Sequence, residues 1–173
     1  MIIFNDEAKM KKITCTFLCL VFVCILFIAI FSATPALAGS DSTLISGQTV
    51  YVPVYSHIYY GEKSKQFLLA ATLSIRNTDP QYPITVLSAQ YFDSDGSLVR
   101  NYVNEPIELR PMASSYIYVK ESDTSGGSGA NFIVRWKSEH TVNEPVIESI
   151  MIGASAGQGI SFVCPGRVIK ENN

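Results

Sequence analysis

The chain has 173 residues and a formal net charge of −2, from 13 lysines and arginines against 15 aspartates and glutamates. Because the basic residues form no cluster along the sequence, this balance argues against a nucleic-acid-binding protein. The length is sufficient for one domain that buries a hydrophobic core without disulfide bonds.

Residues 1–38 are predicted to be a secretory signal peptide. Three lysines between positions 9 and 12 precede an apolar run of 15 residues, Phe17 to Phe31, and small residues stand at Ala36 and Ala38. A basic start, an apolar centre and small residues before the cleavage site are the pattern of such peptides. The run is shorter than the roughly 18 residues that indicate a membrane span. We therefore expect cleavage after Ala38.

Cleavage predicts an extracytoplasmic protein, periplasmic or secreted, and leaves Cys164 as the single cysteine of the mature chain. An internal disulfide bond is then excluded. The alternative is an uncleaved segment, residues 13–33, that anchors the protein in the membrane. Translation starts at Met1 or at Met10, and the choice does not change the mature chain.

The remaining chain divides into a polar lead (39–47), a domain (48–169) and a tail (170–173). The domain is rich in Val, Ile, Tyr, Phe and Thr, and Pro, Gly, Asn or Asp interrupt it every 8 to 12 residues. This rhythm is typical of short antiparallel strands. The predicted strands are 49–60, 68–77, 84–92, 97–103, 114–120, 131–137, 145–153 and 159–164. Seven or eight such strands predict an all-β, antiparallel, immunoglobulin-like sandwich of two sheets, following the signal helix.

The first predicted strand, TVYVPVYSHIYY, has two different faces. Val50, Val52, Val54 and Ile58 share one face, whereas Tyr51, Tyr55, His57 and Tyr59 share the other. Pro53 favours an edge strand or a bulge, since proline cannot donate to a neighbouring strand. The aromatic face is therefore a candidate surface for a glycan or an extended peptide. The alternative is that sandwich strands simply favour tyrosine.

Alternation also orients the later strands. In the second strand Leu69, Ala71, Leu73 and Ile75 are predicted to face inward. The turn DSDG should join the next two strands in a hairpin, because Asp and Gly supply the backbone geometry of tight reversals. In the last strand Cys164 should share the core side with Ile160 and Phe162, behaving as a small hydrophobic residue. Pro165 and Gly166 are expected to end that strand.

The sequence offers little support for catalysis. The mature chain has only two histidines, His57 and His140, and no Gly-x-Ser-x-Gly motif, which argues against a hydrolytic triad. His140 is predicted to lie in a polar loop. The predicted loops do contain the carboxylates Asp93, Asp95, Glu121 and Asp123, which leaves an enzyme that uses loop carboxylates as the alternative.

No metal or cofactor is predicted. A blue-copper site needs a histidine and usually a methionine soon after its cysteine, and neither follows Cys164. The DSDG turn lacks the further acidic positions of a calcium-binding loop. The acidic, glycine-rich loop ESDTSGGSGA, with Glu121 and Asp123, is a second candidate binding surface.

Four stretches, VYVPVYSHIYYG, LSIRNTDP, GANFIVRW and IGASAGQGISFVCPGRVI, resemble the bacterial family catalogued as domain of unknown function 3124. The resemblance implies a bacterial, exported protein and brings no activity, cofactor or partner. We therefore expect an exported, non-enzymatic binding or assembly module that acts through an edge strand or a loop end. Its partner would be a protein or glycan of the cell envelope.

Overall fold

The structure, a computed structural model, describes residues 44–155 and 157–171. The predicted signal peptide and most of the polar lead lie outside these residues. Within them the chain forms twelve strands and one short 3₁₀ turn, η1 (Gly127–Gly129). The prediction of an all-β, antiparallel protein is confirmed. No helix in this part of the chain is long and apolar enough to cross a membrane.

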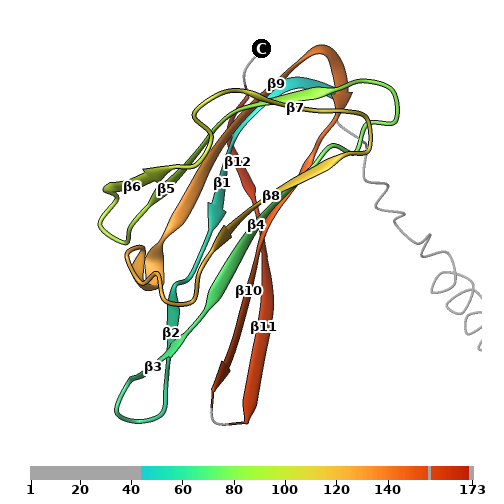
Figure 1. Cartoon of the computed structure of the whole chain (residues 1–173). Coiled ribbons are helices and arrows are strands. Elements are labelled where there is room, and N and C mark those ends of the chain that lie inside the picture. Colours follow the sequence, from blue (N-terminus) through green and yellow to red (C-terminus); the bar gives the residue numbers. More distant parts are fainter. Residues whose placement is uncertain (1–43, 156, 172–173) are drawn as a thin grey trace, which may run out of the picture. The chain divides into compact units, whose positions relative to one another are not determined.

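The strands form two larger sheets and one separate hairpin (Figure 1). The six-stranded sheet has the order β12 (Arg167–Glu171), β1 (Leu44–Pro53), β9 (Asn131–Asn143), β5 (Ile84–Phe92) and β6 (Leu98–Asn101), with β7 (Ile107–Leu109) also paired to β5. The four-stranded sheet has the order β11 (Gln158–Pro165), β10 (Val146–Ser155), β4 (Ala70–Arg76) and β8 (Ser114–Val119). The hairpin consists of β2 (His57–Tyr60) and β3 (Lys65–Leu68).

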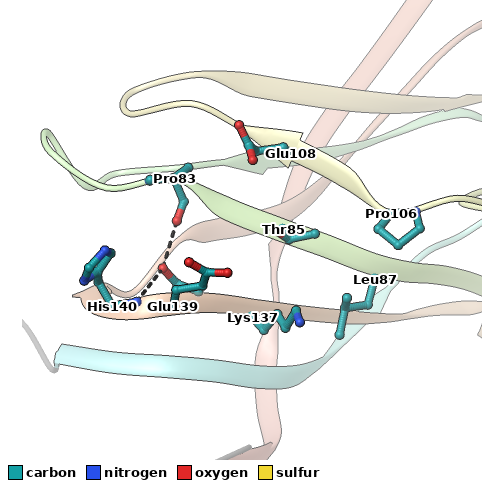
Figure 2. Close-up of a pocket in the computed structure, with 9 residues that line it drawn as sticks. Pro83, Thr85, Leu87, Pro106, Glu108, Lys137, Glu139 and His140 are labelled. Atoms are coloured by element: carbon teal, nitrogen blue, oxygen red, sulfur yellow. Dashed lines mark hydrogen bonds between the residues drawn. The ribbon is translucent and has the colours of Figure 1, made fainter.

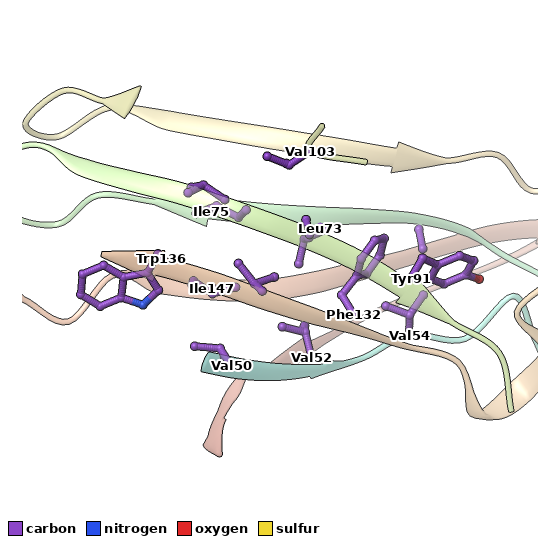
Figure 3. Packing of buried hydrophobic residues seen from close by; sticks show 14 of the residues in the cluster. Val50, Val52, Val54, Leu73, Ile75, Tyr91, Val103, Phe132, Trp136 and Ile147 are labelled. Carbon is purple, nitrogen blue, oxygen red and sulfur yellow. The ribbon is translucent and has the colours of Figure 1, made fainter. Parts of the chain in front are cut away.

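The two larger sheets share one hydrophobic core, as in a sandwich (Figure 3). The four residues predicted to face inward before and along β4 are all buried: Leu69, Ala71, Leu73 and Ile75. Trp136 closes one end of the core, and Phe132 and Tyr91 lie together at the other, with ring centroids 4.9 Å apart. Two-residue alternation thus places one side of each sheet against the other.

The prediction that residues 49–60 form one continuous edge strand is wrong. β1 ends at Pro53 and lies between β12 and β9, inside the six-stranded sheet. After Pro53 the chain leaves the sheet, and β2 begins only at His57. A proline is tolerated here because its missing N–H falls at the end of the strand.

The strands extend beyond the predicted domain, residues 48–169, at both ends. β1 begins at Leu44, inside the predicted polar lead, and β12 continues to Glu171, inside the predicted tail. The chain crosses from the four-stranded to the six-stranded sheet at Gly166, whose N–H donates to the carbonyl of Ile147 at 2.8 Å. A bend of this kind is how strands change sheets at the corner of a sandwich.

The structure has more strands than the seven or eight that were predicted, and three short strands account for most of the difference. β7, and all of β3 except Leu68, lie in segments with no predicted strand, and β2 is separate from β1. β9 is longer than predicted and includes His140, which was expected in a loop. The local sequence of that region, SEHTVN, is polar, so its pairing depends on the neighbouring strand, β1, where Leu44 and Ile45 align with Asn143 and Val142.

A buried polar network joins three loops at the Trp136 end of the core. The side-chain amide of Asn77 donates to the carbonyls of Tyr82, Leu109 and Arg110. The carboxylate of Asp79 accepts hydrogen bonds from the backbone N–H groups of Gln81, Tyr82 and Asn143. The bonds from Gln81 and Tyr82 are the main reason why the pKa of Asp79 lies below its usual value. The ionised carboxylate therefore stabilises the fold.

We expect Gly166→Ala to destabilise the protein by about 1–3 kcal/mol, the usual range for overpacking. An added Cβ would lie 2.6 Å from the backbone carbonyl oxygen of Ile147 and 2.7 Å from a methyl group of Val50. Urea unfolding measures the change. Gly159→Ala is the matched control, because its Cβ would meet only the Gly153 carbonyl at 3.9 Å. Equal midpoints for both variants would contradict a tight crossing.

We expect Asp79→Asn to destabilise the protein at neutral pH, since an amide replaces one accepting oxygen and leaves at least one N–H without an acceptor. The lowered pKa of Asp79 means that its stabilising effect is complete above the unfolded value, about 3.9, and is lost as pH falls through the folded value. The difference in free energy of unfolding between native protein and variant should therefore shrink below about pH 4.

Urea unfolding at a series of pH values tests this expectation. Asp95→Asn is the control, because Asp95 is exposed at the turn between β5 and β6. A difference between native protein and Asp79→Asn that stays constant down to the acid transition would show that ionisation of Asp79 is not the cause.

Candidate functional site

A shallow cleft on the outer side of the six-stranded sheet is a candidate catalytic site (Figure 2). It has a volume of about 390 Å³, and its lining includes the charged side chains of Glu108 on β7 and of Lys137 and Glu139 on β9, together with His140 on β9. Enzyme sites are usually concave and combine convergent polar groups with apolar walls. The cleft has polar groups of this kind, so their geometry decides whether the cleft can be an enzyme site.

The cleft has no activated nucleophile among the described residues. Two hydroxyl residues line it, Thr85 and Ser138, and Ser138 Oγ donates to the carbonyl oxygen of Pro83 at 2.8 Å (Figure 2). The ring of His140 stacks on Tyr82, with centroids 4.1 Å apart. A hydrolytic triad needs the hydroxyl to donate to the histidine. This arrangement therefore does not fit acyl transfer.

The predicted loop carboxylates lie in two loops that the structure brings together. Ser94 Oγ donates to the carbonyl of Gly126 and accepts from the N–H of Gly129. Two of the predicted loop carboxylates, Asp93 and Asp123, accept hydrogen bonds, and each accepts them within its own turn. Asp93 accepts from the N–H groups of Asp95 and Ser97, and Asp123 accepts from the N–H and hydroxyl of Ser125. Such bonds are typical of turn-forming aspartates.

The predicted aromatic face is divided among three places. Tyr51 lies on the outer side of the six-stranded sheet, opposite Ile133 and Arg167. Tyr55 is half-buried and packs edge-on against Phe162, with centroids 5.8 Å apart. The four residues do not share a face, because the chain leaves the sheet after Pro53.

The last two residues of the aromatic set lie on β2 and contact each other. His57 is buried, whereas Tyr59 is 55% exposed. Nε2 of His57 is 3.2 Å from the hydroxyl of Tyr59 and 3.4 Å from Nε2 of Gln66. His57 therefore holds the hairpin together and is not free to contact a partner. Ser56, the residue before it, donates its N–H to the carbonyl of Gly127, so β2 lies beside the predicted acidic loop.

The exposed edge of the four-stranded sheet is a feature that the sequence analysis missed. β11 is its terminal strand, with eight residues paired in unbroken register to β10. From Gln158 to Pro165 the sequence QGISFVCP has no charged residue. β12, the edge of the other sheet, has Arg167, Lys170 and Glu171. Natural edge strands are usually protected by charges, prolines or bulges. β11 has no charge and no bulge, and its one proline, Pro165, is its last residue, so the strand before it is open to pairing.

The backbone of β11 has hydrogen-bonding groups that point away from β10. In an antiparallel pair alternate residues bond to the partner strand and the others point outward. The bond from Gly166 N–H to the Ile147 carbonyl and the register of the pair place the outward groups on Gly159, Ser161 and Val163. A further strand could bond to these groups.

The outward side chains of β11 extend an apolar surface. Val163, Ile150, Thr72 and Tyr118 form one row across β11, β10, β4 and β8. Val163 is 52% exposed, Tyr118 53% and the neighbouring Ile152 56%. An edge strand with an adjacent apolar surface can select the side chains of a bound peptide.

Cys164 lies on the side of β11 that the sequence predicts. It pairs with Ser149, and Phe162 pairs with Met151, both buried, whereas Val163 is on the opposite side. Cys164 is half-buried and packs against the core. Burial raises the pKa of its thiol. No three His, Cys, Asp or Glu side chains gather as a metal site in the described part of the chain.

Comparison with known proteins gives one family and one structural likeness. Residues 47–169 match the family described as "Protein of unknown function (DUF3124)", which confirms the resemblance seen in the sequence. No curated protein matches the chain. A crystal structure described as that of Thermotoga maritima 1070 has 11% sequence identity and a TM-score of 0.45, and the match covers 72% of this chain and 97% of that one.

We expect a polar maleimide to label Cys164 much more slowly in the folded protein than in urea at the same pH, because burial both blocks access and raises the pKa of the thiol. Ser161→Cys in a Cys164→Ser background is the control, since Ser161 is exposed. Equal rates for Cys164 in the folded and unfolded protein would contradict the register of β11.

Proposed function

The chain belongs to the family described as protein of unknown function (DUF3124), and we propose that it is an exported, non-enzymatic binding or assembly module. Its ligand is an extended segment of a cell-envelope protein, which pairs with β11 as an additional strand. The observation that carries this proposal is the uncharged, eight-residue edge strand with outward backbone groups.

Strand addition uses two features of this edge. The outward N–H and C=O groups of Gly159, Ser161 and Val163 supply backbone bonds, which depend little on the sequence of the partner. The row that includes the exposed Val163 and the half-buried Ile150 supplies apolar contacts to alternate side chains. The first feature accounts for affinity and the second for selectivity.

The remaining parts of the proposal come from the sequence and the pairing of the strands. Export rests on the signal-peptide pattern of residues 1–38. For the scaffold we infer an immunoglobulin-like relation, since β4 with β8 and β5 with β9 form pairs in opposite sheets, like the B/E and C/F pairs of that fold. β1 and β10 pair differently, with β9 and β4.

Two observations favour a binding module over the alternative enzyme. Asp93 and Asp123 accept bonds within their own turns, and Ser138 in the cleft is bonded to a backbone carbonyl. The exposed apolar surface beside β11 is the feature expected of a binding protein.

We expect Ser161→Pro to abolish most partner binding while the domain still folds. The N–H of Ser161 points away from β10, so a proline there removes a bond to the partner but none to β10. Ser161→Ala is the matched control, because it retains the N–H. Loss of one or two backbone bonds at about 1 kcal/mol each predicts at least a fivefold fall in affinity.

Crosslinking in the native host measures the effect. A photo-crosslinking residue at Val163 should give one dominant adduct with the native chain and with Ser161→Ala, and much less with Ser161→Pro. Circular dichroism and urea midpoints establish that both variants fold. Equal adduct yields for the proline and alanine variants would contradict strand addition at β11.

A further inference from the structure

Four basic side chains gather on the outer face of the six-stranded sheet. They are Arg135 and Lys137 on β9 and Arg167 and Lys170 on β12, all exposed. They make up four of the ten lysines and arginines between residues 44 and 171, a range that has twelve acidic residues. A net negative domain thus has one face on which cations are concentrated.

The strand register explains the gathering. Lys170 aligns with Thr49 on β1, and Thr49 aligns with Arg135 on β9. Directly opposite residues on adjacent strands point to the same face, and adjacent strands lie about 4.8 Å apart. Lys170 and Arg135 are therefore about 10 Å apart at the backbone, and Lys137 is two residues, about 7 Å, further along β9. Long side chains from these three positions can reach one small anion.

The three cations border a cleft of about 490 Å³. Its described lining also includes the hydroxyl residues Ser46 and Thr49, and it contains no carboxylate. Gly47 aligns with Lys137 and adds no side chain beside it. Leu87, the extra residue where the register of β5 and β9 shifts, forms an apolar wall.

The acidic groups nearby lie outside this cleft. Lys137 also lines the cleft of Figure 2, where Glu108 and Glu139 lie. Glu171 follows Lys170 and aligns with Gln48. The acidic side chains therefore lie beyond Lys137 on one side and beyond Lys170 on the other. This arrangement favours an anion held between Arg135 and Lys170.

We propose that this cleft binds a phosphate group of an organic phosphate. Arg135 offers a planar fork that bonds two phosphate oxygens at once, and the two lysines add positive charge. Tyr51 lies in the next row, aligned with Arg167, and its ring is placed to contact the organic part of the ligand. This site is on a different sheet from β11 and does not depend on the proposed strand addition.

Calorimetric titration with inorganic phosphate, pyrophosphate and a sugar phosphate tests the site at low ionic strength. We expect saturable binding that weakens as salt is added, because exposed charges are screened. Arg135→Gln should weaken binding at least tenfold, and Arg135→Lys should lose less because it retains the charge but not the fork. The matched control is Lys63→Gln combined with Lys65→Gln, in the β2–β3 hairpin, which should not change the affinity.

A second arm identifies the source of the phosphate. Phosphatidylglycerol and phosphatidylcholine vesicles are compared for binding by the native chain and by Arg135→Gln. Binding to phosphatidylglycerol that requires Arg135 assigns the cleft to a lipid headgroup, whereas binding to the sugar phosphate alone assigns it to a soluble or glycan phosphate. Absence of saturable binding in both arms, or an equal loss in the Lys63 and Lys65 variant, would overturn the proposal.

Discussion

Both proposed surfaces depend on the close crossing of the chain at Gly166. Before this residue the chain is the edge of the four-stranded sheet, and after it the chain is the edge of the six-stranded sheet. The crossing is possible because the absent side chain lets the backbone lie against the carbonyl of Ile147 and against Val50. It leaves β11 paired only with β10 within residues 44–155 and 157–171, and it places Lys170 beside Thr49.

The two sheet edges formed by this crossing differ in a way that has physical consequences. Charged side chains on β12 disfavour pairing with another strand, because a partner would have to approach or bury them. β11 has no such charges, and no strand among the described residues pairs with the outer side of its backbone. An edge of this kind is prone to aggregation unless a strand occupies it, which supports a role in binding an extended segment.

Two buried polar side chains hold several of the connecting loops in place. Asn77 and Asp79 together engage backbone groups from the segments around Tyr82, Arg110 and Asn143, so three connections are fixed by two side chains. Asp93 and Asp123 act in the same way within their own turns. For Asp79 the bonds from backbone N–H groups favour the ionised form of the carboxylate and lower its pKa.

The sequence alone determined most of the longer strands and, in those strands, the side that faces the core. Leu73, Ile75 and Cys164 lie where alternation puts them, because the two-residue period is a property of the local backbone. Which strands become neighbours was decided only by the tertiary structure. β1 reads as an edge strand from Pro53 but lies inside its sheet, and the segment after Gly166, where no further strand was predicted, forms β12 and pairs with β1. The cation group likewise joins Arg135 and Lys170 through Thr49, residues far apart in sequence whose proximity comes from pairing between distant segments rather than from any local pattern.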